Sequence, residues 1–452
     1  MVRDVLVEGM YGRIFPKHLE IIPQLNEVYE LALAFYESQL LNEDELIRNG
    51  AYFARVGERL TRHYLMCTGE PVRLPKHSSS RLRSFFANNL FKTGYATHGL
   101  FPYRGKFHPQ MIKGLINIMG LKPGDTILDP MMGSGTVLIE ATLMGIKSVG
   151  IDVSPFCRFM TQAKLNGLVI PQKPLYGALK NYKELFEHFV KVIGQSEQGS
   201  KQRTKGRNNW LGSVVRETTA AYEAKKSKQQ HRLIGSEDAA VYDFLSLAYL
   251  DSAGYAERSN RASPIEQFRT VLERYVFVVE KIQRILDGSE SELAEARALE
   301  GDARALPLEP QSIDGVLFSP PYSFAIDYLQ NDSFHLNYLG EDIVKLREKM
   351  IGLRGKKLRE KYDLYIADMN QVLSECARVL RAGRLCTIVV GTNDKQLSKV
   401  LDVPPEEVPG LHKILADLAV EHSFIPVRSL ARRISGIANT MREEYIVILE
   451  KT

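Results

Sequence analysis

Thr126-Ile127-Leu128-Asp129-Pro130-Met131-Met132-Gly133-Ser134-Gly135-Thr136 is the stretch that decides the fold of this chain. Its first three residues predict a short strand, and Thr136–Met144 predicts a helix. Between them, two glycines let the backbone approach a ligand closely, and the helix start offers unpaired N–H groups. The acidic Asp129 ahead of the glycines favours a cationic amino acid portion over a pyrophosphate, which it would repel. The stretch therefore predicts an α/β unit that holds a ligand at its turn.

Strands and helices alternate on both sides of this stretch. Pro109 suits the first position of a helix that runs to Met119, and a second strand follows at Ser148–Asp152. Later in the chain we expect strands at Ile313–Phe318, Arg384–Gly391 and Glu444–Leu449, and helices at Tyr365–Leu380 and Leu411–His422. Such alternation is typical of an α/β sheet flanked by helices.

Two regions depart from this alternation. Residues 1–90 predict a mostly helical region, with apolar residues at helical spacing over Gln24–Gln39. Residues 171–295 are polar, contain the only tryptophan, and end in a strongly helical stretch, Pro264–Leu286. We therefore expect an α/β domain made of residues 91–170 and 296–452, split by an inserted, mostly helical, basic region that recognises the target.

A second motif, Ser319-Pro320-Pro321-Tyr322, follows the strand Ile313–Phe318. The two prolines end the strand and fix an extended, rigid turn at its carboxyl end, the edge where ligands bind in open α/β sheets. The hydroxyl and the carbonyls can accept hydrogen bonds from the amino group of a planar ring, and the tyrosine can stack on its face. The alternative is a surface turn in the polyproline conformation.

Two carboxylates fall at corresponding places in the α/β pattern. Asp152 ends the second strand, where a ribose-binding carboxylate belongs, and Asp302 lies just ahead of the Ser-Pro-Pro-Tyr strand, where it could accept from an adenine amino group. The alternatives are a helix N-cap for Asp152 and a turn residue for Asp302. Leu138 stands where a dinucleotide fingerprint has its third glycine, which disfavours a nicotinamide-dependent oxidoreductase.

Charge is unevenly placed along a chain whose formal net charge is +5. Ser200–Arg232 holds nine Lys and Arg against two Glu, and Lys345–Lys361 holds eight against two. These stretches indicate contact with a polyanion, and the alternative is solvated helix faces or loops. The residues that we expect to contact nucleic acid are Arg104, Lys201, Arg203, Lys205, Arg207, Arg354, Lys356, Lys357 and Arg359.

Composition argues against several other classes of protein. The four cysteines form no CxxC pair, no His/Cys cluster has metal-ligand spacing, and no stretch approaches the roughly 20 apolar residues of a membrane span. The first residues lack the apolar core of a signal peptide. We therefore expect a cytoplasmic protein with no bound metal and no membrane contact.

The two motifs in this order resemble those of the amino-methyltransferases that use S-adenosyl-L-methionine, particularly the enzymes that methylate cytosine N4 in DNA. The resemblance covers roughly residues 98–170 and 296–452. It implies a Rossmann-like class I methyltransferase core with a mostly parallel seven-stranded sheet. The long insertion and the N-terminal region depart from the family pattern, and they bear on the target more than on the chemistry.

The resemblance also implies site residues and a mechanism. The catalytic residues would be Ser319, Pro320, Pro321 and Tyr322, with the tyrosine stacking on a flipped base. The cofactor would contact Lys106, Phe107, His108, Asp129, Pro130, Gly133, Ser134, Gly135, Thr136, Asp152 and Asp302. The implied activity is a site-specific DNA modification, and the alternatives are an RNA amino-methyltransferase, an adenine N6 enzyme, and a nucleic-acid-binding protein without catalysis.

Overall fold

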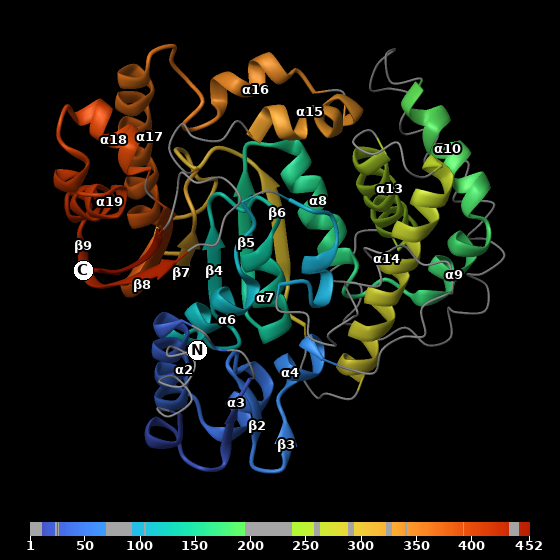
Figure 1. The fold of residues 1–452 in the computed structure, drawn as a ribbon, viewed down its shortest axis with the longest axis horizontal. Helices are drawn as coiled ribbons and strands as arrows, with labels where there is room; N and C mark the ends of the chain where they lie inside the picture. Colours follow the sequence, from blue (N-terminus) through green and yellow to red (C-terminus); the bar gives the residue numbers. More distant parts are fainter. Residues whose placement is uncertain are drawn as a thin grey trace.

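The structure is a computed structural model of the 452-residue chain. It describes residues 11–22, 25, 27–68, 93–103, 105–194, 237–256, 263–287, 293–321, 328–339, 341–391, 393–433 and 443–452. Figure 1 shows a central sheet with helices on both faces. The predicted Rossmann-like α/β fold, with a mostly parallel seven-stranded sheet flanked by helices, is confirmed.

The central sheet has the strand order β6-β5-β4-β7-β8-β10-β9. Its strands are β4 (Thr126–Asp129), β5 (Lys147–Asp152), β6 (Ala296–Glu300), β7 (Ile313–Phe318), β8 (Leu380–Gly391), β9 (Phe424–Arg433) and β10 (Glu443–Lys451). The strands from β6 to β8 pair in parallel, and β10 runs antiparallel to both of its neighbours. Strand order reverses between β4 and β7, and in open α/β sheets such a reversal opens a crevice at the carboxyl edge.

Successive side chains of the buried strands point to opposite faces of the sheet and so contribute to two separate cores. Ile127 and Leu317 face a core that includes α6 (Pro109–Ile118), α7 (Thr136–Met144) and α8 (Pro155–Asn166). Leu128, Val316 and Phe318 face the opposite core, which α17 (Leu358–Val379) and α19 (Leu411–Val420) cover. Because both faces are covered, these strands bury apolar side chains on both sides and do not alternate between apolar and solvent-exposed polar residues.

The N-terminal region combines helices with a three-stranded sheet that the sequence did not predict. Its elements are β1 (Leu19–Ile21), α2 (Val28–Leu40), α3 (Glu43–Asn49), β2 (Phe53–Val56), β3 (Arg59–Leu60), α4 (Arg62–Cys67) and the 3-10 turn η1 (Ala96–Gly99). The buried Glu37 of α2 accepts hydrogen bonds from the backbone N–H of Ala51, at 3.1 Å, and from Asn117 Nδ2 of α6, at 2.6 Å. This contact fixes the region against the α/β domain.

The region inserted between β5 and β6 is helical where the structure describes it. It contains α9 (Gln172–Lys180), α10 (Tyr182–Gly194), α13 (Glu237–Ala256) and α14 (Pro264–Asp287). Phe244 of α13 packs on Tyr275 of α14, with ring centroids 5.2 Å apart, and both side chains belong to the core that contains α8. The basic stretch Ser200–Arg232 lies outside the described residues.

The remaining elements follow β7. They are α15 (Tyr328–Leu339), α16 (Ile343–Lys349), α18 (Asp394–Leu401) and the 3-10 turn η5 (Pro405–Glu407). Figure 1 shows α15 and α16 at one end of the sheet and the N-terminal region at the other. Among the described helices, none has the length and apolarity needed to cross a membrane.

Candidate active site

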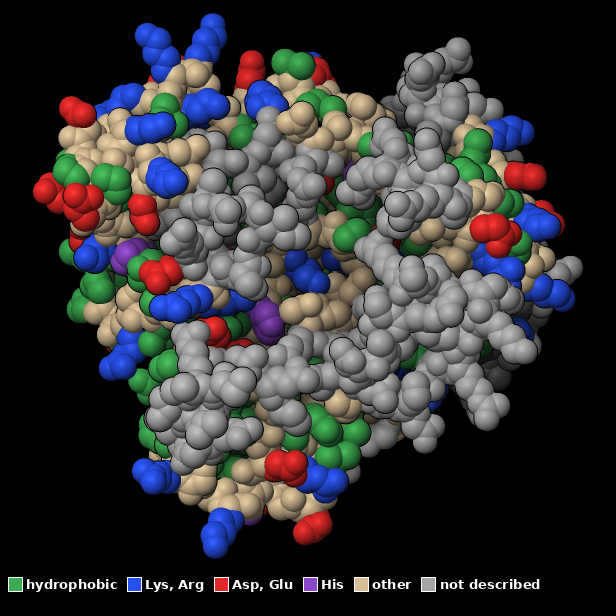
Figure 2. All heavy atoms as spheres, in the orientation of Figure 1, with side chains coloured by type: hydrophobic (Ala, Val, Ile, Leu, Met, Phe, Trp, Pro, Cys, Tyr) green, Lys and Arg blue, Asp and Glu red, His purple; other side chains and the backbone are tan. Residues whose placement is uncertain are grey.

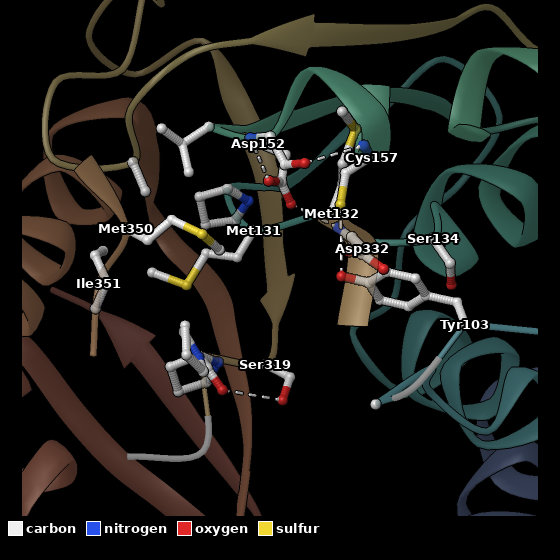
Figure 3. Close-up of a pocket in the computed structure, with 18 of the residues that line it drawn as sticks. Tyr103, Met131, Met132, Ser134, Asp152, Cys157, Ser319, Asp332, Met350 and Ile351 are labelled. Atoms are coloured by element: carbon white, nitrogen blue, oxygen red, sulfur yellow. Dashed lines mark hydrogen bonds between the residues drawn. The ribbon is translucent and has the colours of Figure 1, made fainter. Parts of the chain in front are cut away.

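A cavity that is partly open to solvent lies where β4, β5 and β7 end, and its space amounts to about 980 Å³ when the solvent at its mouth is included. Figure 3 shows Tyr103, Cys157 and Asp332 on one side of this pocket, Met350 and Ile351 on the other, and Ser319 at a third edge. The cavity therefore brings together residues from seven separate segments of the described sequence. It lies at the crevice that the strand reversal predicts.

The glycine turn forms one wall of the cavity. Pro130, Gly133, Ser134 and Thr136 line it, whereas Gly135 stands behind the wall. Both glycines have positive φ, +48° at Gly133 and +75° at Gly135, a conformation that glycine adopts without the Cβ penalty. A Cβ on Gly135 would lie 2.4 Å from Thr161 Cγ2 of α8, so this position requires glycine for space as well.

Asp152 joins the glycine turn to the end of β5. Its Oδ2 accepts from the backbone N–H of Gly133 at 2.9 Å, and its Oδ1 accepts from the backbone N–H of Ser154 at 2.8 Å. Burial raises the pKa of Asp152 to about 6, although these two hydrogen bonds act in the opposite direction. The carboxylate lines the cavity and keeps further acceptor positions for the hydroxyl groups of a ligand.

Asp302 also lines the cavity, and Arg304 holds it in place. Arg304 Nε donates to Oδ1 of Asp302 at 2.9 Å and Nη2 donates to Oδ2 at 2.7 Å. Burial raises the pKa of Asp302, but the hydrogen bonds from Arg304 outweigh burial and lower the pKa below its usual value. Asp302 therefore stays ionised and oriented beside the ligand space.

The segment ahead of α6 contributes in a more limited way than the sequence predicted. Phe107 and Lys106 line the cavity, but Lys106 Nζ turns away and donates to the carbonyls of Thr93, at 2.9 Å, and His98, at 2.8 Å. Burial lowers the pKa of Lys106 to about 8. His108 is the N-cap residue of α6 and stands outside the cavity lining.

Asp129 lies beneath the glycine turn and not in the cavity wall. Its Oδ1 accepts from the backbone N–H of Met131 at 3.0 Å, and its Oδ2 has no hydrogen-bond partner among the described residues. Burial raises the pKa of Asp129 well above its usual value. In this position the side chain fixes the start of the turn.

The Ser-Pro-Pro part of the second motif reaches the cavity directly from β7. Ser319, Pro320 and Pro321 line it, and the Ser319 hydroxyl lies 3.5 Å from the Pro320 carbonyl oxygen. That separation is long for an O–H···O hydrogen bond, so both oxygens are available to a ligand. Tyr322 lies outside the described residues.

Four cavity residues had no motif to mark them. Tyr103 lies in the loop ahead of α6, and its hydroxyl is 3.5 Å from Cys157 Sγ. Asp332 comes from α15, and Met350 and Ile351 follow α16. Asp332 could have been found from its place in the sequence. A helix that begins shortly after the Ser-Pro-Pro turn must pass the same edge of the sheet, so its residues are candidates for the cavity lining.

The predicted nucleic-acid contacts fall into three groups. Lys356 and Lys357 are exposed before α17, next to the cavity segment 349–351. Arg354 is paired with Asp368, and Arg359 is paired with Asp363 at 3.0 Å, so both already have carboxylate partners. Figure 2 shows Lys and Arg side chains gathered over α16, α17 and α18. The remaining predicted contacts lie outside the described residues: Arg104, Lys201, Arg203, Lys205 and Arg207.

The cavity suits a nucleoside joined to a charged amino acid. The acidic wall at Asp152 and Asp302 offers acceptors for hydroxyl and amino groups, and Met350 and Ile351 offer an apolar face for a ring. The first turn of α7 leaves backbone N–H groups free at Thr136, which lines the cavity. Within the described residues, no cluster of His, Cys, Asp and Glu is arranged to hold a metal ion.

Several proteins of known activity are similar to parts of this chain. The type II methyltransferase M.BsoBI of Geobacillus stearothermophilus is 27% identical over 306 residues, which are 59% of this chain and 57% of that protein. The type II methyltransferase M.MjaII of Methanocaldococcus jannaschii is 41% identical over 102 residues, 22% of this chain and 18% of that protein. The chain thus spans less than two thirds of the length of either relative.

A third relative is named as an enzyme that methylates tRNA. The tRNA (guanine(10)-N2)-dimethyltransferase of Methanothermobacter thermautotrophicus is 47% identical over 53 residues, 12% of this chain and 16% of that protein. The family model described as UPF0020, RMKL-like methyltransferase domain, matches residues 100–332, which include the glycine turn, Asp152, Asp302 and the Ser-Pro-Pro motif. Because this match covers more than half of the sequence, the chain belongs to the family of RMKL-like methyltransferase domains.

Proposed function

We propose that this protein methylates cytosine N4 in DNA at a specific sequence. The observation that carries the proposal is that Ser319 and Pro320, at the end of β7, share one cavity with the glycine turn and Asp152. This arrangement supports the proposal, because it offers two oxygen acceptors in the same cavity as the glycine turn. The similarity to two type II methyltransferases supports DNA as the substrate.

S-adenosyl-L-methionine is the cofactor, and it supplies an electrophilic methyl group on a sulfonium. The protein's task is to make an exocyclic amino group reactive, because its lone pair is delocalised into the base. Hydrogen bonds from the amino group to the Ser319 hydroxyl and the Pro320 carbonyl favour a pyramidal nitrogen. Those contacts free the lone pair for in-line attack, so that catalysis depends on positioning and electrostatics.

The described cysteines argue against the other methylation chemistry of cytosine. Methylation at C5 needs a thiolate that attacks C6 of the ring. All four cysteines are buried, and burial raises the pKa of each thiol. Of the four, only Cys157 lines the cavity, and the nearby carboxylates Asp152 and Asp332 raise the pKa of its thiol further and disfavour a thiolate. An exocyclic amino group is therefore the better substrate for this site.

A second candidate function is methylation of an amino group in RNA. The similarity to a tRNA guanine-N2 enzyme favours it, and the same two acceptors suit the exocyclic amino group of guanine. Adenine N6 is a third possibility, although the resembling N6 enzymes usually carry Asp or Asn at the position of Ser319. The lead proposal rests on serine at that position.

Transfer of tritiated methyl groups to DNA and to RNA, in parallel, tests these functions. Digestion to nucleosides and chromatography identify the modified base and atom. Label in N4-methylcytosine from DNA is the expected result. Label in N2-methylguanine from RNA would replace the lead proposal with the second candidate, and label in neither polymer would contradict both.

A further inference from the structure

Asp332 is held at the cavity by an aromatic contact one helical turn further along α15. His335 stacks on Phe156 of α8, with ring centroids 4.7 Å apart and an interplanar angle of 13°. It also meets Phe101 edge-on, with ring centroids 4.9 Å apart. Because residues three apart share a face of a helix, this anchor directs Asp332 to the same side, where it lines the cavity.

The charges around the cavity are unevenly compensated among the described lining residues. Three carboxylates line it, from Asp152, Asp302 and Asp332. Asp302 is paired with Arg304, and Lys106 turns its ammonium group towards two backbone carbonyls. No ion pair is found for Asp152 or Asp332 among the described residues. Lys349 also lines the cavity, but no ion pair between its ammonium group and either of these two carboxylates is found among the described residues.

The pKa values of both acids are raised, and Asp152 contributes to the shift of Asp332. Burial, and then the charge of Asp152, raise the pKa of Asp332 to about 7. Burial raises the pKa of Asp152 to about 6. A positive charge in the cavity would stabilise the ionised form of both carboxylates, because an opposite charge at short range favours it.

We propose that Asp332 is a cofactor-binding residue that recognises positive charge, and that with Asp152 it makes the cavity prefer the sulfonium of the methyl donor over the uncharged thioether of the product. The inference rests on the proposed methyl-transfer function. The inference also explains how the product could be released. When the methyl group is transferred, the sulfur loses its positive charge, so the carboxylates no longer attract the demethylated product at that point.

Isothermal titration calorimetry on the full chain tests this role with three probes. S-adenosyl-L-methionine and sinefungin carry a positive charge at this position, as a sulfonium and an amine, whereas S-adenosyl-L-homocysteine does not. We expect Asp332→Asn to weaken the binding of S-adenosyl-L-methionine and sinefungin about 10-fold, or about 1.4 kcal/mol. The affinity for S-adenosyl-L-homocysteine, whose thioether is uncharged, should change by less than about 2-fold. Equal losses for all three probes, or no loss for any, would overturn the inference.

Two further variants make the result specific to charge. Met350→Ala shortens a neutral side chain on the opposite side of the pocket, so it should weaken all three probes equally. Asp332→Glu keeps the charge and should retain the preference for charged probes, which also covers the case in which Asp332→Asn fails to fold. Loss of the preference in Asp332→Glu, with the fold intact, would contradict a charge-based role.

The same titrations separate this inference from the proposed function. Wild-type protein that binds the charged probes more tightly than the uncharged one, yet methylates neither DNA nor RNA, would contradict the proposed function and leave the inference standing. Wild-type protein that methylates DNA but binds all three probes equally well would support the proposed function and contradict the inference.

Discussion

Arg304 orients Asp302 through two parallel hydrogen bonds, from Nε to Oδ1 at 2.9 Å and from Nη2 to Oδ2 at 2.7 Å. The same guanidinium donates to the carbonyl of Lys349 at 2.9 Å and to Asp368 at 2.8 Å. One side chain therefore ties the acidic wall of the cavity to the segment that carries Met350 and Ile351. Arg304 therefore sets the position of the acidic wall relative to the apolar wall.

Arg304→Lys should weaken cofactor binding about 10-fold, equally for the methyl donor and its demethylated product. Lysine keeps the charge but cannot make the two parallel hydrogen bonds, each of which contributes about 1 kcal/mol. Calorimetry measures both affinities. Arg378→Lys is the matched control, because Arg378 makes a similar paired contact with Glu375 away from the cavity. An equal loss in the control would mean that the effect is on stability alone.

Ser319→Ala should lower kcat by about 10- to 100-fold and leave cofactor affinity unchanged, because one hydrogen bond to the reacting amino group is lost. Single-turnover methyl transfer measures the rate, and calorimetry measures the affinity. Ser312→Ala serves as the control, since its hydroxyl only donates to the Glu309 carbonyl ahead of β7. Unchanged transfer by Ser319→Ala would remove this residue from the active site.

Gly135→Ala should lower the free energy of unfolding by about 2–4 kcal/mol, because the new methyl group adds a steric clash to the strain of a positive φ. Thr161 Cγ2 would lie 2.4 Å from the new Cβ. Gly120→Ala isolates the strain, since Gly120 has nearly the same φ, +71°, and nothing within 4 Å of its Cβ position. Urea denaturation measures both, and equal losses would show that crowding contributes nothing.

Glu140→Gln should cost about 3–5 kcal/mol of stability, because it removes one charge of a buried pair and leaves the other uncompensated. Glu140 accepts from Tyr95, at 2.6 Å, and from His98, at 2.7 Å, and lies 3.6 Å from Lys113 Nζ. The exposed Asp44, paired with Arg59 at 2.9 Å, is the control, and Asp44→Asn should cost less than about 1 kcal/mol.

The Glu140 contacts also give stability a pH dependence with a definite sign. Burial raises the pKa of Glu140, but Lys113 and the hydrogen bonds outweigh it and lower the pKa from 4.5 to about 2. The folded state therefore binds fewer protons than the unfolded state in this range. The contribution is fully present above pH 4.5 and is lost as the pH falls towards 2. Glu140→Gln should remove this part of the acid sensitivity in urea titrations.

Preference for the charged cofactor should rise with pH between about 5 and 7.5, as Asp152 and Asp332 lose their protons. Their pKa values are about 6 and about 7. The neighbouring Tyr103 and Cys157 stay neutral there, since burial raises both pKa values, and Lys106, with a pKa of about 8, stays mainly protonated. Calorimetry across this range measures the ratio of affinities, and a constant ratio would contradict the pKa shifts.

Much of the fold follows from local sequence. The strand β4, the helix α7 and the strand β7 lie within a residue of their predicted positions, because apolar runs bounded by glycine and proline leave few alternatives. The edge strand β9 was missed. Its residues Phe424–Arg433 are mostly exposed and mix apolar with basic side chains, so no buried face marks them.

The site residues that directly follow a strand were predictable from the sequence. The contacts that hold some of these residues in place come from distant parts of the chain and were not predictable. The glycine turn and Ser319 follow directly from their strands. The contact of Arg304 with Asp368 depends on α17, 64 residues further along the chain, and one of the two carbonyl contacts of Lys106 depends on His98 in η1. Such contacts form only when the tertiary structure does, so spacing along the chain carries no sign of them.

The shared core of α8, α13 and α14 limits how this protein can acquire a new target. Tyr275 and Phe244 are completely buried beside residues of the α/β domain, so the helices of the insertion are structural supports of the catalytic half. Exchanging residues 171–295 as a cassette would expose the apolar surface of α8 on which α13 packs, and α8 also carries Phe156, the ring on which His335 of α15 stacks. Variants of this proposed target-recognition region should therefore carry their substitutions on the outer surface of these helices, with the inner faces preserved.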